Sequence, residues 1–449
     1  MKAMVGDTVV ITKGKETFEG VLLPSAQKGV LILKLDSGYN IGIDEKGVTQ
    51  IKVVQHAGRG EDNEGKKEWK KEKITLSLQE KGGNDLPRVT ILHTGGTIAS
   101  KVDYKTGGVI AKFTPEDLLE LIPELKTVAT LSSRLVRQMS SEDIRFSHYN
   151  VLAREIVKEI KNRADAIIIT HGTDTLHYTS AALAFMFERL PIPVILVGAQ
   201  RSSDRGSSDA AWNLLSAIKF ATHTDFADVA ICMHENMNDD NCVILPATKT
   251  RKMHTSRRDA FKAINCLPWA YINPKTNVID FLRKDYTQRT NIDGVSPKLF
   301  KEKLKVGVIK VHTNMYAEQF AVYKNWDGLV IEGTGIAGNI PIHKIDEYTG
   351  EHTKIYTVLK KMIKDGLVAV AASQTIFGRI DMNVYNTGRE MQDIGIVGNN
   401  GDMTAETAFI KLSWLLSNYP PQKAKEMMIQ NLRGEIGERS CVQDEKLFE

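Results

Sequence analysis

Cysteine is scarce in this chain, and the spacing of the few present does not favour metal binding. The 449 residues contain four cysteines, none of them in a Cys-x-x-Cys arrangement. Disulfide frameworks need a dense set of cysteines, and structural zinc sites commonly use closely spaced pairs. The sequence therefore disfavours a disulfide-stabilised fold and a zinc site, and it predicts buried, reduced thiols.

Long apolar runs and a strong net charge are also absent. The N-terminal stretch MKAMVGDTVVITKGK has no apolar signal core, and no segment approaches the ~18 consecutive apolar residues of a membrane span. The formal net charge of +4 argues against a dedicated polyanion-binding protein. We therefore expect a cytoplasmic protein, in which 42% hydrophobic residues supply substantial cores.

The first part of the sequence predicts a small antiparallel domain. Within residues 1–57, short segments of alternating apolar and polar residues are separated by Gly and Asp-Ser-Gly turns, which is typical of tightly connected β-strands. This pattern favours a small, SH3-like β-barrel. Residues 58–87 include the mixed-charge run GRGEDNEGKKEWKKEK, so we interpret them as a charged linker with one short possible strand, ITLSL.

From residue 88 onward, apolar strand-like runs alternate with helical patterns. Near-continuous runs such as AIIIT and VILVG indicate strands buried on both faces, as in parallel sheets covered by helices. A second series of this kind begins near residue 305. We therefore predict an α/β core of two domains with parallel sheets flanked by helices, at 88–270 and 305–449, with a polar, turn-rich interdomain connection at 271–304.

Two of the predicted strands end in clusters of glycine and hydroxyl-bearing residues. VTILHTGGTIAS (89–100) places two glycines directly before Thr97, and IITHGTDTLHYTS (168–180) places Thr173 and Asp174 directly after its glycine. Ligand sites in open α/β sheets form beyond the carboxyl ends of strands, and glycines let the backbone turn sharply beside a ligand. We therefore expect the two threonine hydroxyls to face one crevice, beside the Asp174 carboxylate.

A hydroxyl becomes an effective nucleophile when a base removes its proton. The segment TKTRKMHTSRRDAFK (248–262) offers two candidate bases, Lys249 and Lys252. A partly desolvated lysine beside Asp174 would accept the Thr173 proton, so that threonine, lysine and carboxylate act as nucleophile, base and orienting group. Backbone N–H groups of the glycine turns would stabilise the oxyanion.

The residues by themselves leave other interpretations open. Glycine- and threonine-rich strand ends are also typical of structural turns and of phosphate-binding loops, although neither segment has a GxxxxGK[ST] or GxGxxG pattern. His171 and His177 are six residues apart rather than four, which disfavours a metal site on one helix face. Lys252 also fits an ordinary solvated surface lysine.

Taken together, the motifs resemble those of the bacterial-type asparaginase and glutaminase family. TGGTIAS (94–100) and HGTDTLHYTS (171–180) are similar to its two signature motifs, VGAQRSSDRGSSDAAWNL (197–214) to a third segment, and MSSED (139–143) to its substrate clamp. The resemblance covers about residues 88–435. It implies an asparaginase-like fold and an enzyme that hydrolyses a side-chain amide to ammonia and a carboxylate. It also implies that this chain needs no metal or cofactor.

The resemblance also implies catalytic roles for particular residues. Thr97 would be the primary nucleophile, and Thr173, Asp174 and Lys252 would form a second catalytic group. Lys252 is preferred over Lys249 because of its distance from the shared AFK ending, although the segment departs from the usual spacing.

Substrate-binding roles follow in the same way. Ser141, Glu142 and Asp174 would hold the α-amino and α-carboxylate groups of the substrate. Tyr104 is the candidate for the loop tyrosine that assists the first threonine in this family, although its sequence context is a poor match.

The N-terminal domain and charged linker depart from free-standing asparaginases. In front of such a core they resemble the amidotransferase branch of the family, whose members release ammonia from glutamine for a separate partner subunit. That partner would carry ATP and Mg²⁺ and would bind the tRNA, and the family's shared active sites imply a homodimer of this chain. A free-standing cytoplasmic L-asparaginase is the alternative, because the same catalytic residues would serve it.

Overall fold

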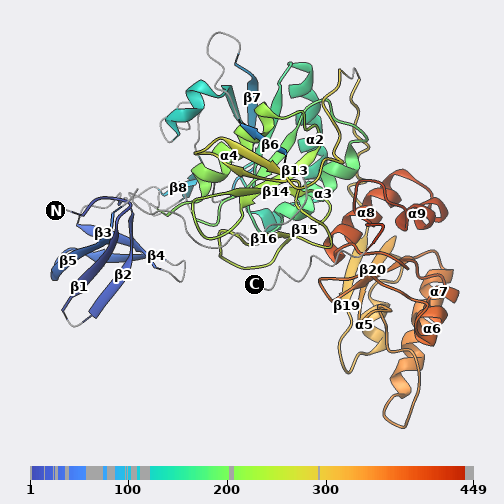
Figure 1. The fold of residues 1–449 in the computed structure, drawn as a ribbon. Helices are drawn as coiled ribbons and strands as arrows, with labels where there is room; N and C mark the ends of the chain where they lie inside the picture. Colours follow the sequence, from blue (N-terminus) through green and yellow to red (C-terminus); the bar gives the residue numbers. More distant parts are fainter. Residues whose placement is uncertain are drawn as a thin grey trace.

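The protein begins with a five-stranded antiparallel sheet (Figure 1). The computed structural model describes residues 3–14, 16–23, 25, 29–35, 40–56, 74–77, 86–96, 98, 100–102, 109–111, 122–201, 207–291 and 294–439. The sheet has the order β4-β3-β2-β1-β5, with β1 (Thr8–Lys13), β2 (Glu16–Leu23), β3 (Val30–Lys34), β4 (Asn40–Asp44) and β5 (Val48–Gln55). Its inward-facing side chains form a small core of Val9, Ile11, Leu22, Leu33 and Ile43. The predicted antiparallel N-terminal domain is confirmed.

The central element of the core is a nine-stranded sheet with the order β10-β7-β11-β12-β13-β14-β17-β18-β6. Its first five strands are parallel: β10 (Thr130–Leu135), β7 (Arg88–His93), β11 (Ala166–Thr170), β12 (Val194–Val197) and β13 (Val229–His234). Every residue of β11, β12 and β13 is buried, as expected for strands covered on both faces. The parallel α/β core predicted from the apolar runs is therefore confirmed.

The remaining four strands extend this sheet in antiparallel fashion. They are β14 (Cys242–Pro246), β17 (Ala270–Asn273), β18 (Val278–Phe281) and β6 (Ile74–Ser77). The possible strand ITLSL within the predicted linker 58–87 is present as β6, whereas β18 lies within residues 271–304, where only a connection was predicted. β18 is four residues long, so its apolar pattern is too short to stand out from the polar residues around it.

Helices cover both faces of the sheet (Figure 1). On one face, α2 (Phe146–Lys161) and α3 (Leu176–Met186) contribute to a large apolar cluster, and on the other α4 (Ala210–His223) contributes to a second cluster. A short hairpin of β15 (Thr250–Lys252) and β16 (Phe261–Ala263) stands beside the sheet. This hairpin carries one of the candidate catalytic lysines.

The C-terminal part contains a smaller parallel sheet of β19 (Val306–Lys310), β20 (Gly328–Gly333) and β21 (Val368–Ser373). Its helices are α5 (Ala317–Ala321), α6 (Gly350–Lys364), α7 (Asn386–Asp393), α8 (Ala405–Asn418) and α9 (Pro421–Met428). Residues of α8 belong to the same apolar cluster as α2 and α3, so this cluster joins the two parts of the core. Within the described ranges, no helix has both the length and the apolar character needed to cross a membrane.

Candidate active site

Strands β7 and β11 end side by side in the central sheet. They pair in parallel with His93 opposite Thr170, and the His93 Nδ1 lies 2.8 Å from the Thr170 Oγ1. Immediately after β7, both the backbone N–H and the hydroxyl of Thr94 donate to the Thr170 carbonyl, at 3.1 and 3.0 Å. The two turns rich in glycine and threonine therefore leave the same edge of the sheet.

The two turns also touch each other through their glycines. Gly96 has a φ of +81°, and a Cβ built on it would lie 2.5 Å from the Gly172 nitrogen. A side chain at this position would therefore need both a disfavoured backbone conformation and space that the second turn occupies. Thr97 directly follows this contact, but Thr97 and Tyr104 lie outside the described residues, so the structure does not place their side chains.

Three of the predicted catalytic residues meet in one hydrogen-bonded group. The Lys252 Nζ donates to the Thr173 Oγ1 at 2.9 Å and to the Asp174 Oδ1 at 2.7 Å. The Lys252 side chain is 10% exposed, whereas that of Asp174 is 69% exposed and open to a ligand. The group combines a nucleophilic hydroxyl, an amine that can take its proton, and a carboxylate that orients the amine.

Regular structure fixes the positions of these side chains. Lys252 ends β15 and pairs with Phe261 of β16, and the backbone bond from Met253 to Ala260 continues the hairpin at 2.6 Å. Asp174 lies just before α3, where the exposed N–H groups of a helix favour negative charge. Lys252 thus reaches the turn that carries Thr173 and Asp174 from a separate element.

Lys249, the alternative base, has a different partner. Its Nζ lies 2.6 Å from the Asp402 Oδ2, and the two side chains are 2% and 0% exposed. Asp402 precedes α8, so this buried ion pair links the hairpin segment to the C-terminal part of the core. The structure therefore brings Lys252, rather than Lys249, to Thr173.

Ser141 and Glu142 lie in a short 3-10 helix, η3 (Ser141–Asp143). A Cβ on Gly172 would lie 2.8 Å from the Ser141 Cβ, and the Thr175 hydroxyl donates to the Ser141 carbonyl at 2.6 Å. Ser141 is buried against the second turn, and Glu142 is exposed. The structure thus places Ser141 directly beside the turn that carries Thr173, and Glu142 next to it in the chain.

The connection between β12 and α4 forms another wall of the site. A Cβ on Gly198 would lie 2.8 Å from the Thr173 Cγ2. The buried Asp209 carboxylate holds this connection by accepting from the backbone N–H groups of Gln200 and Arg201 at 3.0 and 3.1 Å. The sequence reasoning assigned no role to Gly198 or Asp209, although both lie in the segment VGAQRSSDRGSSDAAWNL that carries part of the family resemblance.

Three histidines near the site are buried and neutral. His171 is fully buried, with its Nδ1 2.6 Å from the Gly172 carbonyl and its Nε2 2.8 Å from the Thr179 hydroxyl. Burial lowers the pKa of His93, His171 and His177 to about 4 in each case. These rings support the two turns and do not add positive charge to the site near neutral pH.

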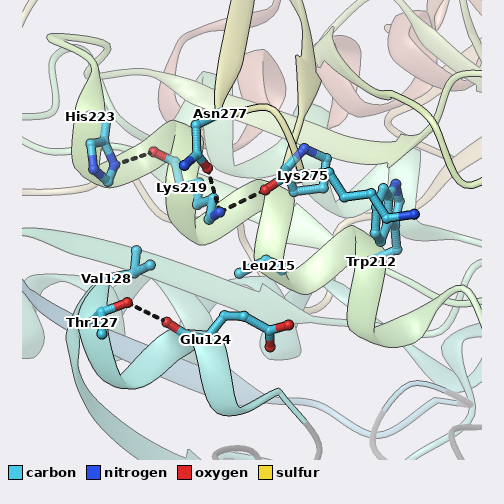
Figure 2. Close-up of a pocket in the computed structure, with 10 residues that line it drawn as sticks. Glu124, Thr127, Val128, Trp212, Leu215, Lys219, His223, Lys275 and Asn277 are labelled. Atoms are coloured by element: carbon cyan, nitrogen blue, oxygen red, sulfur yellow. Dashed lines mark hydrogen bonds between the residues drawn. The ribbon is translucent and has the colours of Figure 1, made fainter. Parts of the chain in front are cut away.

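A separate cavity of about 370 Å³ lies elsewhere on the protein (Figure 2). Its lining includes Leu215 and Lys219 from α4, and Lys275 lies 5.3 Å from the centre of the Trp212 ring. Of the candidate catalytic residues that the structure describes, none lines it. We therefore locate the active site by the chemistry around Lys252 and not by this cavity.

Three sequence families match the chain in order. They are "GatD N-terminal domain" over residues 3–54, "Asparaginase, N-terminal" over residues 88–286 and "Glutaminase/Asparaginase C-terminal domain" over residues 305–428. The chain is 40% identical to the D subunit of glutamyl-tRNA(Gln) amidotransferase from Pyrococcus abyssi, over 96% of this chain and 94% of that protein. It is 38% identical to the protein of the same name from Methanococcus maripaludis, over 97% and 98% of the two chains.

Solved structures of asparaginases are similar to the core. The thermostable L-asparaginase from Thermococcus kodakarensis matches with a TM-score of 0.67 and 29% identity, over 78% of this chain and 100% of that one. L-asparaginase I from Vibrio cholerae matches with a TM-score of 0.66 and 26% identity, over 79% and 100%. Both structures leave about a fifth of this chain unmatched.

Proposed function

Because this chain belongs to the family of glutamyl-tRNA(Gln) amidotransferase D subunits, we propose that it releases ammonia from L-glutamine and supplies it to a partner subunit. Family membership makes it an asparaginase-type amidohydrolase component of an amidotransferase. The partner in this proposal is the E subunit of the amidotransferase, which amidates Glu-tRNA(Gln) to Gln-tRNA(Gln) with ATP and Mg²⁺. This chain forms a homodimer within a cytoplasmic heterotetramer, and the tRNA binds mainly to the partner.

The group of Lys252, Thr173 and Asp174 is the observation that carries the proposed chemistry. With its amine neutral, Lys252 is 2.9 Å from the hydroxyl whose proton it takes, and the Asp174 carboxylate stabilises the ammonium that forms. Thr97 is the primary nucleophile in this proposal, and Tyr104 assists it. The contact between Gly96 and Gly172 supports a site in which both threonines reach one substrate.

The proposed reaction has two stages. A threonine oxygen attacks the carboxamide carbon of glutamine, and the hydroxyl proton passes to the base. The carbon–nitrogen bond then breaks, and the nitrogen takes up that proton and leaves as ammonia. Water attacks the resulting ester, which frees glutamate and regenerates the hydroxyl. Backbone N–H groups of the two turns stabilise the oxyanion, an effect of roughly 3–4 kcal/mol in other enzymes.

Substrate binding in this proposal uses the residues around the second turn. The exposed Asp174 carboxylate and the neighbouring Glu142 pair with the α-ammonium group of the amino acid, and Ser141 binds its α-carboxylate. The location of Ser141 against Gly172 supports this assignment. L-asparagine, which is shorter by one methylene group, is a second candidate substrate.

The test uses the full chain in complex with its partner. Thr97→Val and Thr173→Val preserve side-chain shape but remove the hydroxyl, so each should abolish glutamine-dependent amidation of Glu-tRNA(Gln). Added ammonium chloride should restore amidation in both variants, because the partner's chemistry is intact. Loss of amidation with both nitrogen sources would contradict the proposal and indicate a structural role for the threonines.

A free-standing L-asparaginase is the second candidate function, favoured by the similarity of the core to two L-asparaginase structures. The N-terminal domain argues against it, because residues 3–54 match a domain family named for the amidotransferase. Steady-state turnover of asparagine and glutamine by the purified chain separates the two functions. Rapid asparagine hydrolysis that the partner does not affect would favour the second candidate.

A further inference from the structure

A buried asparagine links the wall of the active site to the interior of the protein. The Asn213 side chain on α4 is fully buried, and its Nδ2 donates to the Gly198 carbonyl at 3.0 Å and to the Asp209 Oδ2 at 3.2 Å. Both partners are acceptors, so the orientation of the amide is fixed and its Oδ1 faces the His234 Nδ1 at 2.6 Å. Since Gly198 lies against Thr173, Asn213 connects the candidate nucleophile to strand β13.

The contacts of His234 define its protonation state. Its Nδ1 faces the Asn213 oxygen and must donate, and its Nε2 lies 3.2 Å from the Asp239 Oδ1. That carboxylate also accepts from Arg258 at 2.6 Å, so it is ionised and requires a proton on the imidazole. His234 is therefore an imidazolium with both nitrogens protonated. In agreement, although burial opposes the charge, hydrogen bonding to Asp239 and Cys242 raises the pKa of His234 to about 9.

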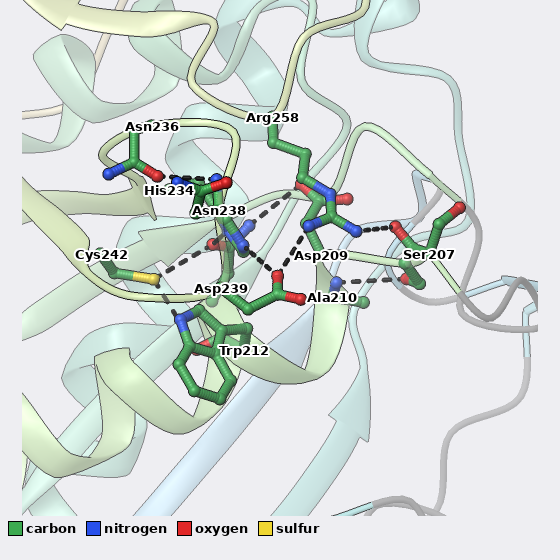
Figure 3. Close-up of polar contacts among 12 residues, drawn as sticks. Ser207, Asp209, Ala210, Trp212, His234, Asn236, Asn238, Asp239, Cys242 and Arg258 are labelled. Carbon is green, nitrogen blue, oxygen red and sulfur yellow. Dashed lines mark hydrogen bonds and ion pairs between the residues drawn. The ribbon is translucent and has the colours of Figure 1, made fainter. Parts of the chain in front are cut away.

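Arg258 connects this imidazolium to the hairpin that carries Lys252. Arg258 lies in the turn between β15 and β16, and its guanidinium is almost fully buried. Besides Asp239, it donates to the Ser207 carbonyl in the connection between β12 and α4 (Figure 3). The turn after Lys252 is thereby tied to the connection that forms the wall beside Thr173.

We propose that His234, Asp239 and Arg258 form an ionic brace that positions Thr173 and Lys252 for amide hydrolysis, so this inference rests on the proposed function. The brace and the direct Lys252–Thr173 hydrogen bond belong to one closed ring of contacts. This ring passes through the loop of Asp239 and the turn of Arg258. The ring consists of residues that contact one another directly or through one short turn: Thr173, Gly198, Asn213, His234, Asp239, Arg258 and Lys252. All three brace residues act through other groups and are positioning residues.

Titratable groups outside the brace also face it, and those that act on His234 are Cys242 and Asp209. The carboxylate of Asp239 is 43% exposed, and although partial burial opposes its ionisation, hydrogen bonding to His234 and the charge of Arg258 lower its pKa to about 2. Burial lowers the pKa of Lys34 on β3, and the charges of Asp239, Arg258 and Asp240 also act on this lysine. Two of the three brace residues are cationic, so neutralising Asp239 leaves adjacent positive charges without their shared carboxylate.

The decisive variant is Asp239→Asn, which keeps the shape of a partly exposed side chain and removes its charge. We expect kcat for ammonia release to fall about 10- to 100-fold with KM within threefold of the parent, because small displacements of catalytic groups have effects of this size. Arg258→Met should behave similarly. Arg257→Met is the matched control, since the neighbouring Arg257 pairs with Asp259 within the hairpin, and its kcat should stay within twofold.

Histidine ring ¹⁵N spectra at pH 8 supply a readout that is independent of activity. The parent should show an imidazolium signal that disappears in His234→Gln, and Asp239→Asn should convert it to a neutral ring. A neutral His234 in the parent, or kcat within threefold of the parent in folded Asp239→Asn, would overturn the brace. Failure of the parent to release ammonia from glutamine or asparagine would instead refute the proposed function, whatever the spectra show.

Discussion

The Lys252 Nζ lies 2.7 Å from the Asp174 Oδ1, although the two residues are 78 positions apart in the sequence. The same nitrogen contacts the Thr173 hydroxyl at 2.9 Å. Because the Asp174 side chain is 69% exposed, solvent screens this ion pair and limits its contribution to stability, so the arrangement is better explained by its chemistry than by folding. The lysine is held where it can exchange a proton with the threonine.

The two lysines of the hairpin segment should respond differently to the same substitution. Lys252→Met should reduce ammonia release at least 1,000-fold, an order of magnitude based on removal of other catalytic bases, and leave thermal stability nearly unchanged. Lys249→Met should instead destabilise the protein by about 3–5 kcal/mol, because it leaves the buried Asp402 without its partner. Steady-state kinetics and urea unfolding of both variants test this. A folded, fully active Lys252→Met protein would refute the assignment of the base.

Asp174 should affect both binding and chemistry, because its carboxylate contacts Lys252 and is open to substrate. We expect Asp174→Asn to raise KM and lower kcat, each at least tenfold, since a lost charge-assisted hydrogen bond is worth about 1.5–3 kcal/mol. Asp285→Asn is a suitable control, because Asp285 is 67% exposed and pairs with Arg283 at 2.6 Å. If both variants keep parental kinetics, Asp174 has no role in the site.

The contact between the two turns can be tested with a pair of glycines that share one backbone conformation. Gly96 and Gly29 both have a φ of +81°, but a Cβ on Gly29 would have no heavy atom within 4 Å. Both substitutions to alanine should cost about 1 kcal/mol of backbone strain. Only Gly96→Ala should also abolish ammonia release, because its Cβ would push the second turn away. Equal activities of the two variants would show that the turns move apart without consequence.

The buried histidines predict a loss of stability in mild acid. The pKa values of His93, His171 and His177 are about 4 in the folded protein, below the ordinary value of 6.5. The unfolded chain therefore takes up protons that the folded chain does not, so stability is retained above pH 6.5 and declines as the pH falls toward 4. Each ring contributes a loss on the order of 3 kcal/mol at the lower end.

Urea unfolding between pH 7 and pH 4.5 measures this loss directly. A His93→Asn variant should show a weaker dependence on pH over the same range, because one of the three buried imidazoles is gone. Constant stability of the parent between pH 7 and pH 5 would show that these rings titrate normally.

The sequence was sufficient to predict the inner strands of the parallel part of the central sheet, but not its edge strand β10, which is TLSSRL and only partly buried. Strands β11 (AIIIT) and β12 (VILV) are nearly continuous apolar runs, and such runs are typical of parallel strands buried on both faces. Of the antiparallel extension, the sequence indicated β6 as the possible strand ITLSL, but it did not indicate β18, which is short and lies among polar residues. Pairing between strands as distant as these depends on tertiary contacts that a local pattern does not encode.

The sequence indicated which residues form the candidate site, but not which of them contact one another. Glycine turns at strand ends indicated the two threonines, and the sequence did not separate Lys249 from Lys252, because both lie in one polar segment; the structure brings Lys252 to Thr173. The brace of His234, Asp239 and Arg258 was missed because its residues come from a strand, a loop and a hairpin turn with no shared motif. A buried asparagine or histidine looks like any polar residue until its neighbours are known.

The central claim is that the hydroxyls of Thr97 and Thr173 reach the same carboxamide. Two oxygens that each approach one carbon within about 3.5 Å are at most about 7 Å apart. A crystal structure of the chain with bound glutamate or aspartate, read for the distance between the two Oγ1 atoms, tests this directly. We predict a separation of about 7 Å or less with the ligand between them, and a separation well above about 10 Å with the ligand bound would contradict the account.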